Sequence, residues 1–262
     1  MESFVQVKER PENSTIVEVI LDRPKVMNAF NTEMAEQLLE IFKNLRTRSD
    51  VRVVGLRSAH EGFFCTGADL KERNRMSEEQ WRNQHHLFEA MFYALADLPM
   101  PTVAVIDGYC LAGGMELALN CDLWVVSEGA TFGLPEVTRG IMPGGGGTRL
   151  LAKRIGVHRA KEVILSGQKF SAQQMAEMGA VNRLVPRERL DAEFLALAQV
   201  ISANAPLAVR FCKAAIDELF GMPDGEARVR ELYWYNQCVD TEDRLEGVRA
   251  FNEKRSPHFQ GR

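Results

Sequence analysis

Two glutamates, twenty positions apart, are the residues of this chain with the clearest potential for chemistry. Glu116 follows Gly113-Gly114-Met115, and Glu136 follows Gly133-Leu134-Pro135. Two carboxylates beside one activated carbonyl can deliver and remove protons at adjacent carbons, and each positioned acid or base contributes roughly 100- to 10,000-fold in rate. The pair therefore favours an enzyme over a binding module.

Backbone amides near these glutamates are the second chemical element. A Gly-Gly step that opens a helix leaves unsatisfied N–H groups at the positive end of the helix dipole, and Gly113 has no side chain to block a ligand oxygen there. A second amide can come from the turn Thr66-Gly67-Ala68-Asp69, where Ala68 is the best candidate. Two converging donors form an oxyanion hole, and one such donor typically lowers a barrier by roughly 3 to 4 kcal/mol.

Each feature also has an ordinary structural explanation. A single glutamate in a short helix usually lies on a solvated face, and a glycine pair at a helix start is usually only a turn. Residues 144–147 are all glycine but match no common nucleotide-binding pattern, and no serine lies in a G-x-S-x-G motif. Cys65 and Cys110 have no identifiable base partner, which disfavours nucleophilic catalysis. No metal site is predicted, because none of the histidines has ligand spacing: His60, His85, His86, His158 and His258.

The elements that must position these residues alternate between strand and helix. Apolar and β-branched runs predict strands at 4–8, 14–21, 51–56, 102–106, 123–126 and 181–185. Apolar residues at helical spacing predict a helix over 34–45 capped by Asn31 or Thr32, a long helix from Ser77 to about residue 98, and a short one from about residue 112. Only helices are expected beyond residue 188, including 205–220 and 225–240. This order predicts an α/β core of crossover units followed by a helical tail.

Composition narrows the class of protein. The chain has 262 residues, 45% of them hydrophobic, so it can bury a large core. A net charge of -4 argues against a general nucleic-acid or membrane-surface binder. Five cysteines without a C-x-x-C pair, and a polar N-terminus without an apolar export segment, predict reduced thiols and a cytoplasmic location. The aromatic load of the tail is expected either to pack onto the core or to be shared between subunits, and composition leaves both open.

Three segments, in this order and spacing, resemble the enoyl-CoA hydratase/isomerase family, also called the crotonase superfamily. They are 64–72, 106–122 and 132–148, which resemble the acyl-CoA loop and the two catalytic segments of that family. The motifs Leu21-Asp22-Arg23-Pro24-Lys25 and Asp243-Arg244-Leu245-Glu246-Gly247 resemble its two ends. The resemblance implies a spiral of ββα units over residues 1–200 and a helical oligomerisation region over 201–262, in a homotrimer or a dimer of trimers (homohexamer).

The resemblance also implies roles for particular residues. The amides of Ala68 and Gly113 would hold the thioester oxygen, and Glu116 and Glu136 match the two catalytic glutamates of the hydratases. The coenzyme A and substrate path would involve Thr66, Ala68, Asp69, Leu70, Lys71 and Gly113. Lys25, Lys71 and Lys254 are candidates for the CoA phosphates, with Lys254 reaching from a neighbouring subunit. No separate cofactor is expected, because coenzyme A is part of the substrate.

The implied reaction is the hydration of a 2-enoyl-CoA to a 3-hydroxyacyl-CoA, a lyase (hydro-lyase) step of lipid and fatty acid metabolism. In this reading Glu116 activates a water that attacks C3, and Glu136 holds that water and delivers a proton to C2. Family isomerases often keep only one of the two carboxylates, which favours hydration here. Methylglutaconyl-CoA hydratases, isomerases and specialised dehydratases remain alternatives. A non-catalytic RNA-binding or scaffold member is a distant one, because Lys43 is the only lysine of the first helix.

The chain departs from the family pattern at a few positions. Ala112 stands where a third glycine is common, and it is expected to be harmless because Gly113 carries the amide. Arg149-Leu150 replaces a frequent Gln-Arg pair, whereas Leu134-Pro135 agrees with the short-chain hydratases. The acyl group is therefore left open.

Overall fold

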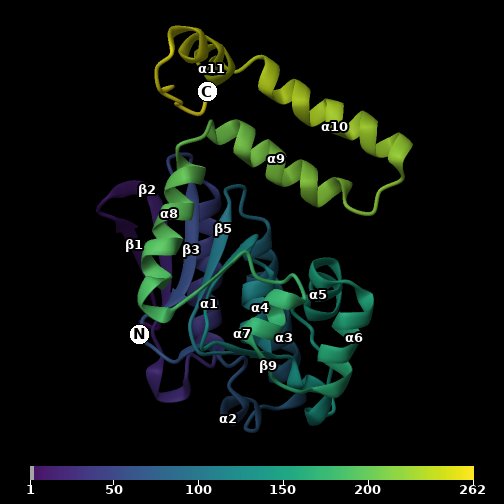
Figure 1. Ribbon diagram of the computed structural model, residues 1–262. Helices are drawn as coiled ribbons and strands as arrows, with labels where there is room; N and C mark the ends of the chain where they lie inside the picture. Colours follow the sequence, from purple (N-terminus) through teal and green to yellow (C-terminus); the bar gives the residue numbers. More distant parts are fainter. Residues whose placement is uncertain (1–2) are drawn as a thin grey trace.

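Two sheets organise the computed structural model, which describes residues 3–262 (Figure 1). The larger sheet has the strand order β1-β2-β3-β5-β7-β10. Its strands are β1 (Val5–Arg10), β2 (Asn13–Leu21), β3 (Val53–Ser58), β5 (Thr102–Ile106), β7 (Leu123–Ser127) and β10 (Arg183–Val185). Only β1 and β2 pair antiparallel in this sheet, and the other neighbours are parallel.

The smaller sheet has the order β4-β6-β8-β9, and its strands are two or three residues long. They are β4 (Phe63–Cys65), β6 (Tyr109–Leu111), β8 (Thr131–Gly133) and β9 (Phe170–Ser171). Each of β3, β5 and β7 is followed along the chain by one strand of the smaller sheet and then by helical structure. This repetition makes the core a spiral of ββα units, as the family resemblance implies.

Helices complete the turns of the spiral. The first turns are followed by α1 (Thr32–Arg46), α2 (Leu70–Arg73), α3 (Glu78–Ala96) and α4 (Gly113–Leu119). Later turns carry the 3₁₀ helix η2 (Pro135–Arg139), then α5 (Gly147–Ile155), α6 (Val157–Ser166) and α7 (Ala172–Glu177). Two short 3₁₀ helices, η1 (Pro24–Val26) and η3 (Arg187–Arg189), lie at connections. Asn31 caps α1 through its side chain, and Ser77 caps α3 in a capping box, so both predicted starts are confirmed.

Both faces of the larger sheet are buried, which explains its nearly continuous apolar strands. Along β5, Val103 and Val105 belong to one apolar cluster, whereas Ala104 and Ile106 belong to the other. The first cluster is covered by α8 (Leu190–Ser202), whose Phe194 is fully buried, and the second contains buried residues of α1, α3 and α4. Figure 1 shows α8 lying across this sheet.

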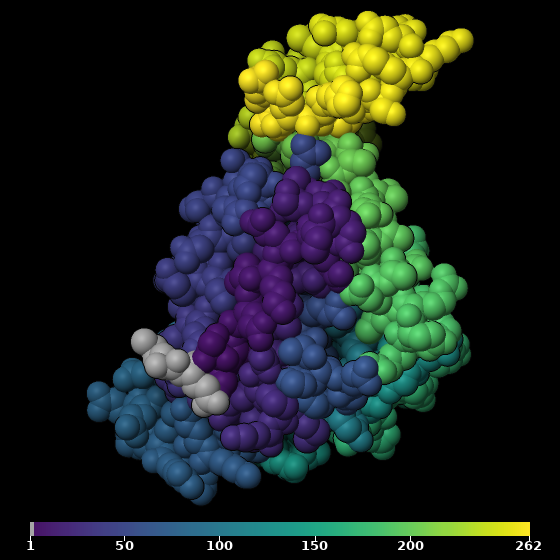
Figure 2. All heavy atoms as spheres, turned by 90° about the vertical axis from the view of Figure 1, so that its left-hand side faces the viewer, coloured from purple at the N-terminus to yellow at the C-terminus, as the bar shows by residue number. Residues whose placement is uncertain are grey.

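Most of the tail extends beyond one end of the core. The tail consists of α9 (Pro206–Leu219), α10 (Asp224–Val239) and α11 (Glu242–Glu253). Figure 1 shows α9 and α10 side by side above the core, and Figure 2 shows the yellow C-terminal part projecting from one end. The first helix of the tail, α9, contacts one end of the core: Arg210 donates to the carbonyls of Arg48, Ser49 and Val51, and Lys213 pairs with Asp122 at 2.7 Å. Large apolar side chains stay exposed on the tail, among them Ile216, Phe220, Val229, Leu232, Tyr235, Val248 and Phe251.

Most predicted elements agree with the structure to within two residues, but the smaller sheet was not predicted. Its strands are short, and the sequence around them reads as turns. The strand predicted over 181–185 is confirmed only as β10, Arg183–Val185. The boundary at residue 200 between core and tail stays a prediction. Within residues 3–262, no individual helix has the length and apolarity to cross a membrane; the pair Arg187–Ser202 and Pro206–Leu219, bent by 104°, meets that test only when taken together.

Candidate active site

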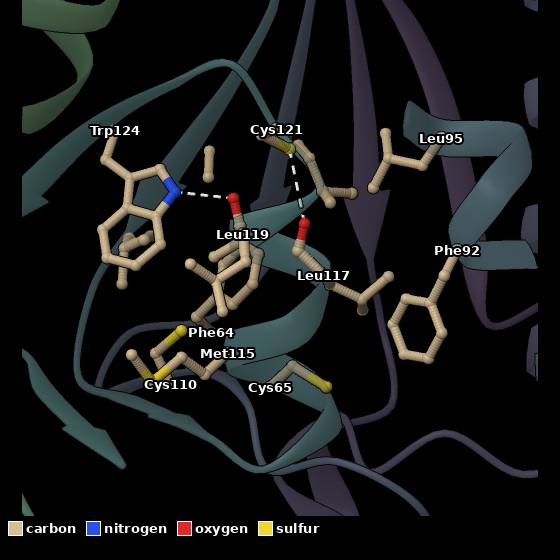
Figure 3. Packing of buried hydrophobic residues seen from close by; sticks show 14 of the residues in the cluster. Phe64, Cys65, Phe92, Leu95, Cys110, Met115, Leu117, Leu119, Cys121 and Trp124 are labelled. Carbon is tan, nitrogen blue, oxygen red and sulfur yellow. Dashed lines mark hydrogen bonds between the residues drawn. The ribbon is translucent and has the colours of Figure 1, made fainter. Parts of the chain in front are cut away.

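The short helix α4 places a backbone amide at the end of a pocket. All seven of its residues are buried, and Met115, Leu117 and Leu119 point into the apolar cluster around it (Figure 3). Trp124 Nε1 donates to the carbonyl of Ala118 over 2.6 Å, which holds the helix from its C-terminal side. A Cβ atom on Gly114 would lie 2.1 Å from the carbonyl oxygen of Cys65, so the helix start must contain a glycine there. This packing fixes where the N–H of Gly113 lies.

The loop that carries Ala68 passes directly beside this helix start. A Cβ atom on Gly67 would lie 2.9 Å from the nitrogen of Gly113, so the two backbones are in close contact. Phe30 and Ala68 form an isolated parallel β-bridge. The N–H of Phe30 donates to the carbonyl of Gly67, and the carbonyl of Phe30 accepts from the N–H of Asp69. Among residues 3–262, none accepts a hydrogen bond from the N–H of Ala68 or of Gly113. Both donors are available to a ligand oxygen.

Ala112, directly before this helix, has a backbone conformation that favours glycine. Its φ of 50° and ψ of -131° lie outside the regions that residues with a Cβ atom ordinarily occupy. The sequence suggested that alanine is harmless at this position. Its backbone strain nevertheless costs on the order of 1–3 kcal/mol of stability. The strain leaves the amide of Gly113 free but lowers the stability of the fold.

Replacing Ala112 by glycine is expected to stabilise the protein by about 1 kcal/mol, since the relieved strain outweighs the added entropy of the unfolded chain. Urea unfolding of the variant measures this gain. Ala203→Gly is the matched control, because Ala203 is exposed, has a φ of -75° and should lose stability on substitution. If both variants lose the same stability, Ala112 is not strained.

Glu116 lies one turn into α4 with only 4% of its surface exposed. Its Oε1 accepts hydrogen bonds from the N–H groups of Gly145 at 2.6 Å and Gly147 at 2.9 Å. Burial raises the pKa of Glu116, and the two backbone hydrogen bonds oppose that rise. The glycine run after Pro143 is therefore a cradle for this carboxylate, which was not predicted from the sequence. A Cβ atom on Gly147 would lie 3.0 Å from Oε1.

Glu136, the other candidate carboxylate, is buried as well. It lies in η2, is 8% exposed, and neither of its side-chain oxygens has a hydrogen-bond partner among residues 3–262. Burial raises its pKa to about 7, and the charge of Glu116 contributes to the rise. A group with this pKa exchanges protons readily near neutral pH, and its free oxygens are available to a ligand.

One pocket of about 270 Å³ contains all these groups. The residues around it include Thr66, Ala68, Leu70, Gly113, Glu116 and Glu136. Its other walls come mainly from α3 and from the segment before α5, through Trp81, His85, Phe88, Phe92, Ile141 and Met142. The arrangement can therefore polarise a carbonyl with two amides and move protons with two carboxylates, inside a largely apolar pocket.

Comparison with known proteins agrees with this geometry. The sequence model for the family described as enoyl-CoA hydratase/isomerase matches residues 11–262. The chain belongs to this family. Enoyl-CoA hydratase domain-containing protein 2, mitochondrial, of Mus musculus is 42% identical over 254 residues, which are 95% of this chain and 86% of that protein. Methylglutaconyl-CoA hydratase, mitochondrial, of Homo sapiens is 36% identical over 254 residues, 95% of this chain and 75% of that protein.

Solved structures give the same result for the fold. The 1.8 Å crystal structure of enoyl-CoA hydratase from Bacillus anthracis superposes with a TM-score of 0.95 at 38% identity, over 99% of this chain and 100% of that one. The crotonase-like spiral implied by the sequence resemblance is therefore confirmed. The names of the two relatives above place those proteins in mitochondria, so the cytoplasmic location predicted here stays a prediction.

The other residues proposed for substrate binding in this enoyl-CoA hydratase/isomerase family member are more scattered. Asp69 does not line the pocket; its carboxylate caps α2 and pairs with Arg23 at 2.8 Å. Lys71 is exposed and lines a separate groove of about 950 Å³. Lys25 is exposed in η1, and Lys254 ends α11 in the tail, so neither lines the pocket. Their phosphate contacts stay predictions.

Several residues of this family member's pocket were not predicted. Phe30, Phe88 and Phe92 form its aromatic wall, with Phe30 and Phe88 at a centroid distance of 4.8 Å. Arg73, Trp81, His85 and Glu89 lie around the pocket as well. The sequence signal that could have indicated part of this wall is the helical spacing of Phe88, Phe92 and Leu95, which is typical of a buried helix face. No group of three or more His, Cys, Asp or Glu side chains in the described part of the chain is arranged to hold a metal ion.

Proposed function

We propose that this protein is an enoyl-CoA hydratase, which adds water across the C2=C3 bond of a 2-enoyl-CoA to give a 3-hydroxyacyl-CoA. One observation carries the proposal: two buried carboxylates and two free backbone amides surround the same pocket. The membership of the family and the hydratase names of its relatives support it. An isomerisation that only moves a double bond would need a single acid–base group, whereas this pocket holds two.

The amides of Ala68 and Gly113 would accept the thioester oxygen between them. As charge develops on that oxygen, the two donors stabilise it, and C3 becomes electrophilic. The site is preorganised, because the packing of α4 and the bridge to Phe30 hold both amides before substrate binds. The fixed amides therefore need little rearrangement during the reaction.

The two carboxylates would divide the proton transfers. Glu116, whose Oε1 accepts hydrogen bonds from the N–H groups of Gly145 and Gly147, takes a proton from water as the water oxygen bonds to C3. Glu136, protonated because its pKa is about 7, gives its proton to C2. The water thus supplies one O–H to C3, one proton passes to Glu116, and the proton of Glu136 ends on C2. Transfer of a proton from Glu116 back to Glu136 restores the site.

The experiment that tests the function is the loss of enoyl-thioester absorbance when the purified protein meets crotonyl-CoA. We expect turnover and a bell-shaped dependence of kcat/KM on pH. The rate should fall above about pH 7, because Glu136 loses the proton that it must donate. It should fall in acid as Glu116 becomes protonated. Absence of hydration across pH 5 to 9 would overturn the proposal, and a rate that stays constant above pH 8 would remove Glu136 as the acid.

We also infer that the protein assembles through its tail, as a homotrimer or a dimer of trimers. The support is the exposed apolar surface of α9 to α11, where Phe251 is 83% exposed. Surface of this kind usually contacts another subunit. The Lys254 contact with a neighbouring CoA belongs to this proposal, because the residue lies in the tail.

A further inference from the structure

Arg73, at the end of α2, is a cation beside the pocket that forms no ion pair with any of residues 3–262. Its Nε donates to the side-chain oxygen of Gln84 at 2.9 Å. Its guanidinium faces the rings of Trp81 and Phe88, each 5.1 Å away. No carboxylate of residues 3–262 lies within ion-pair distance of it, and its two terminal nitrogens donate to none of these residues. Four N–H donors are therefore left for a ligand.

The positive charge of Arg73 is only weakly neutralised by nearby acidic groups. Burial lowers the pKa of Arg73, and the only opposing influence is the charge of Glu72. The carboxylate oxygens of Glu72 are occupied by the N–H of Thr32 and by the side-chain nitrogen of Gln84. A half-buried cation between aromatic rings is stable enough to persist, but it gains from an anion that reaches its free edge.

A continuous aromatic wall connects Arg73 to the proposed oxyanion hole. A Cβ atom on Gly113 would lie 2.6 Å from the ring of Phe30, so that ring touches the helix start. Phe30 meets Phe88 edge to face at 4.8 Å, and Phe88 meets the guanidinium of Arg73. All four residues surround the same pocket as Glu116 and Glu136. A series of direct contacts along one pocket wall therefore joins the proposed oxyanion hole to the cation.

Other charges around this part of the pocket do not cancel that of Arg73. Glu89 lies within 3.3 Å of both His85 and His86, so it has its own nearby partners. Arg139 also lines the pocket, and its guanidinium donates to the carbonyl and hydroxyl of Thr138. Among the pocket residues, the group that combines burial, positive charge and unused donors is Arg73.

We propose that the preferred substrate carries a carboxylate at the far end of a short acyl chain and that Arg73 binds this carboxylate. This inference rests on the proposed function, because it names the substrate class of the same site. The two terminal nitrogens of a guanidinium match the two oxygens of a carboxylate in a fork geometry. Arg73 is thus a specificity residue, and the proton transfers stay with Glu116 and Glu136.

The test compares two substrates that differ only at the distal end. Crotonyl-CoA ends in a methyl group, and (E)-glutaconyl-CoA ends in a carboxylate. We expect the wild type to hydrate glutaconyl-CoA with a kcat/KM at least about 10-fold higher, since charge-assisted hydrogen bonds are worth this much or more. Arg73→Met, which keeps an unbranched side chain, should lose about 30-fold on glutaconyl-CoA and change less than about threefold on crotonyl-CoA.

Two further variants serve as controls. Arg73→Lys should retain part of the preference, because the charge stays but the fork is lost. Arg75→Met should leave the ratio of the two substrates unchanged, since Arg75 is exposed and does not line the pocket. Equal losses on both substrates in Arg73→Met would mean that Arg73 acts on the shared CoA part or on the fold, and would overturn the inference. So would a wild type without preference.

A binding measurement separates this inference from the proposed function. Glutaryl-CoA and butyryl-CoA are saturated counterparts that bind without turnover, and their Kd values can be measured by calorimetry. Tighter binding of glutaryl-CoA that disappears in Arg73→Met supports the carboxylate site even if neither enoyl substrate is hydrated. In that case the hydratase proposal alone fails. Equal Kd values for the two ligands would overturn the carboxylate site whatever the hydration assay gives.

Discussion

Glu136→Gln is expected to lower kcat at least about 100-fold while leaving acyl-CoA binding intact, because glutamine keeps the shape of the side chain but cannot donate a proton as an acid. The same change is expected to make the protein more stable at pH 8, by about 2 kcal/mol. In the wild type, the pKa of Glu136 is raised to about 7, so the fold disfavours the charged form of this side chain. A neutral amide removes that cost.

The pH dependence of this gain follows from linkage. In the unfolded chain Glu136 ionises near its ordinary pKa of 4.5, whereas in the folded protein it keeps its proton up to about pH 7. Between these values the folded state binds more protons, so the stability of the wild type falls as pH rises. The difference between Glu136→Gln and wild type should therefore be near zero at pH 4.5 and reach its maximum above pH 7.

Thermal unfolding at several pH values, with kcat measured in parallel, checks both parts. Glu128→Gln is the matched control, because Glu128 is exposed and should change neither activity nor stability. Activity near that of the wild type would exclude Glu136 from the mechanism. A stability difference that is constant from pH 4.5 to 8 would show that Glu136 is not held in its neutral form.

The second large effect is expected at Glu116, where chemistry and structure can be separated. Glu116→Gln should lower kcat at least about 100-fold, since the amide cannot take a proton from water. Its side-chain oxygen can still accept hydrogen bonds from Gly145 and Gly147, so the fold and ligand binding should survive. Glu116→Ala removes that acceptor, leaves two buried N–H groups unpaired, and should cost an additional 2 kcal/mol or so of stability.

Measurement of kcat, of the Kd for butyryl-CoA and of the melting temperature in both variants distinguishes these effects. We expect Glu116→Gln to melt close to the wild type and to bind butyryl-CoA within about threefold of it, whereas Glu116→Ala melts lower and binds more weakly. If the alanine variant is as stable as the glutamine variant, the cradle formed by the glycine run does not depend on Glu116.

The positions of these two glutamates show what sequence could and could not predict. The pattern of glycines and carboxylates identified Glu116, Glu136, Ala68 and Gly113 as candidates, and the structure brings all four around one pocket. Their burial was not predictable from local pattern, because a glutamate in a short helix is more often solvated. For Glu116, the burial results from contacts with the distant segment around Gly145.

The elements missed in the sequence have a common physical cause. Strands β4, β6, β8 and β9 are two or three residues long, and their pairing joins segments that are far apart in the chain. So short a run carries no periodicity to detect. The pocket wall was missed for a similar reason, since Arg73 and Phe88 meet only through the packing of α3 beside α2. The long strands and helices were predicted well, because their apolar pattern repeats over many residues.

The edges of the two sheets bear on the solubility of the chain. An unpaired strand edge exposes backbone donors and acceptors that can recruit another chain and start aggregation. In the described residues, β1 and β10 are the edges of the larger sheet, and β1 ends in Lys8, Glu9 and Arg10 while β10 has only three residues. The edges of the smaller sheet, β4 and β9, are three and two residues long. We therefore expect little edge-to-edge aggregation in a concentrated solution of the protein. The edge strand β1 carries charged residues, and the edge strands β4, β9 and β10 are too short to pair stably with another chain.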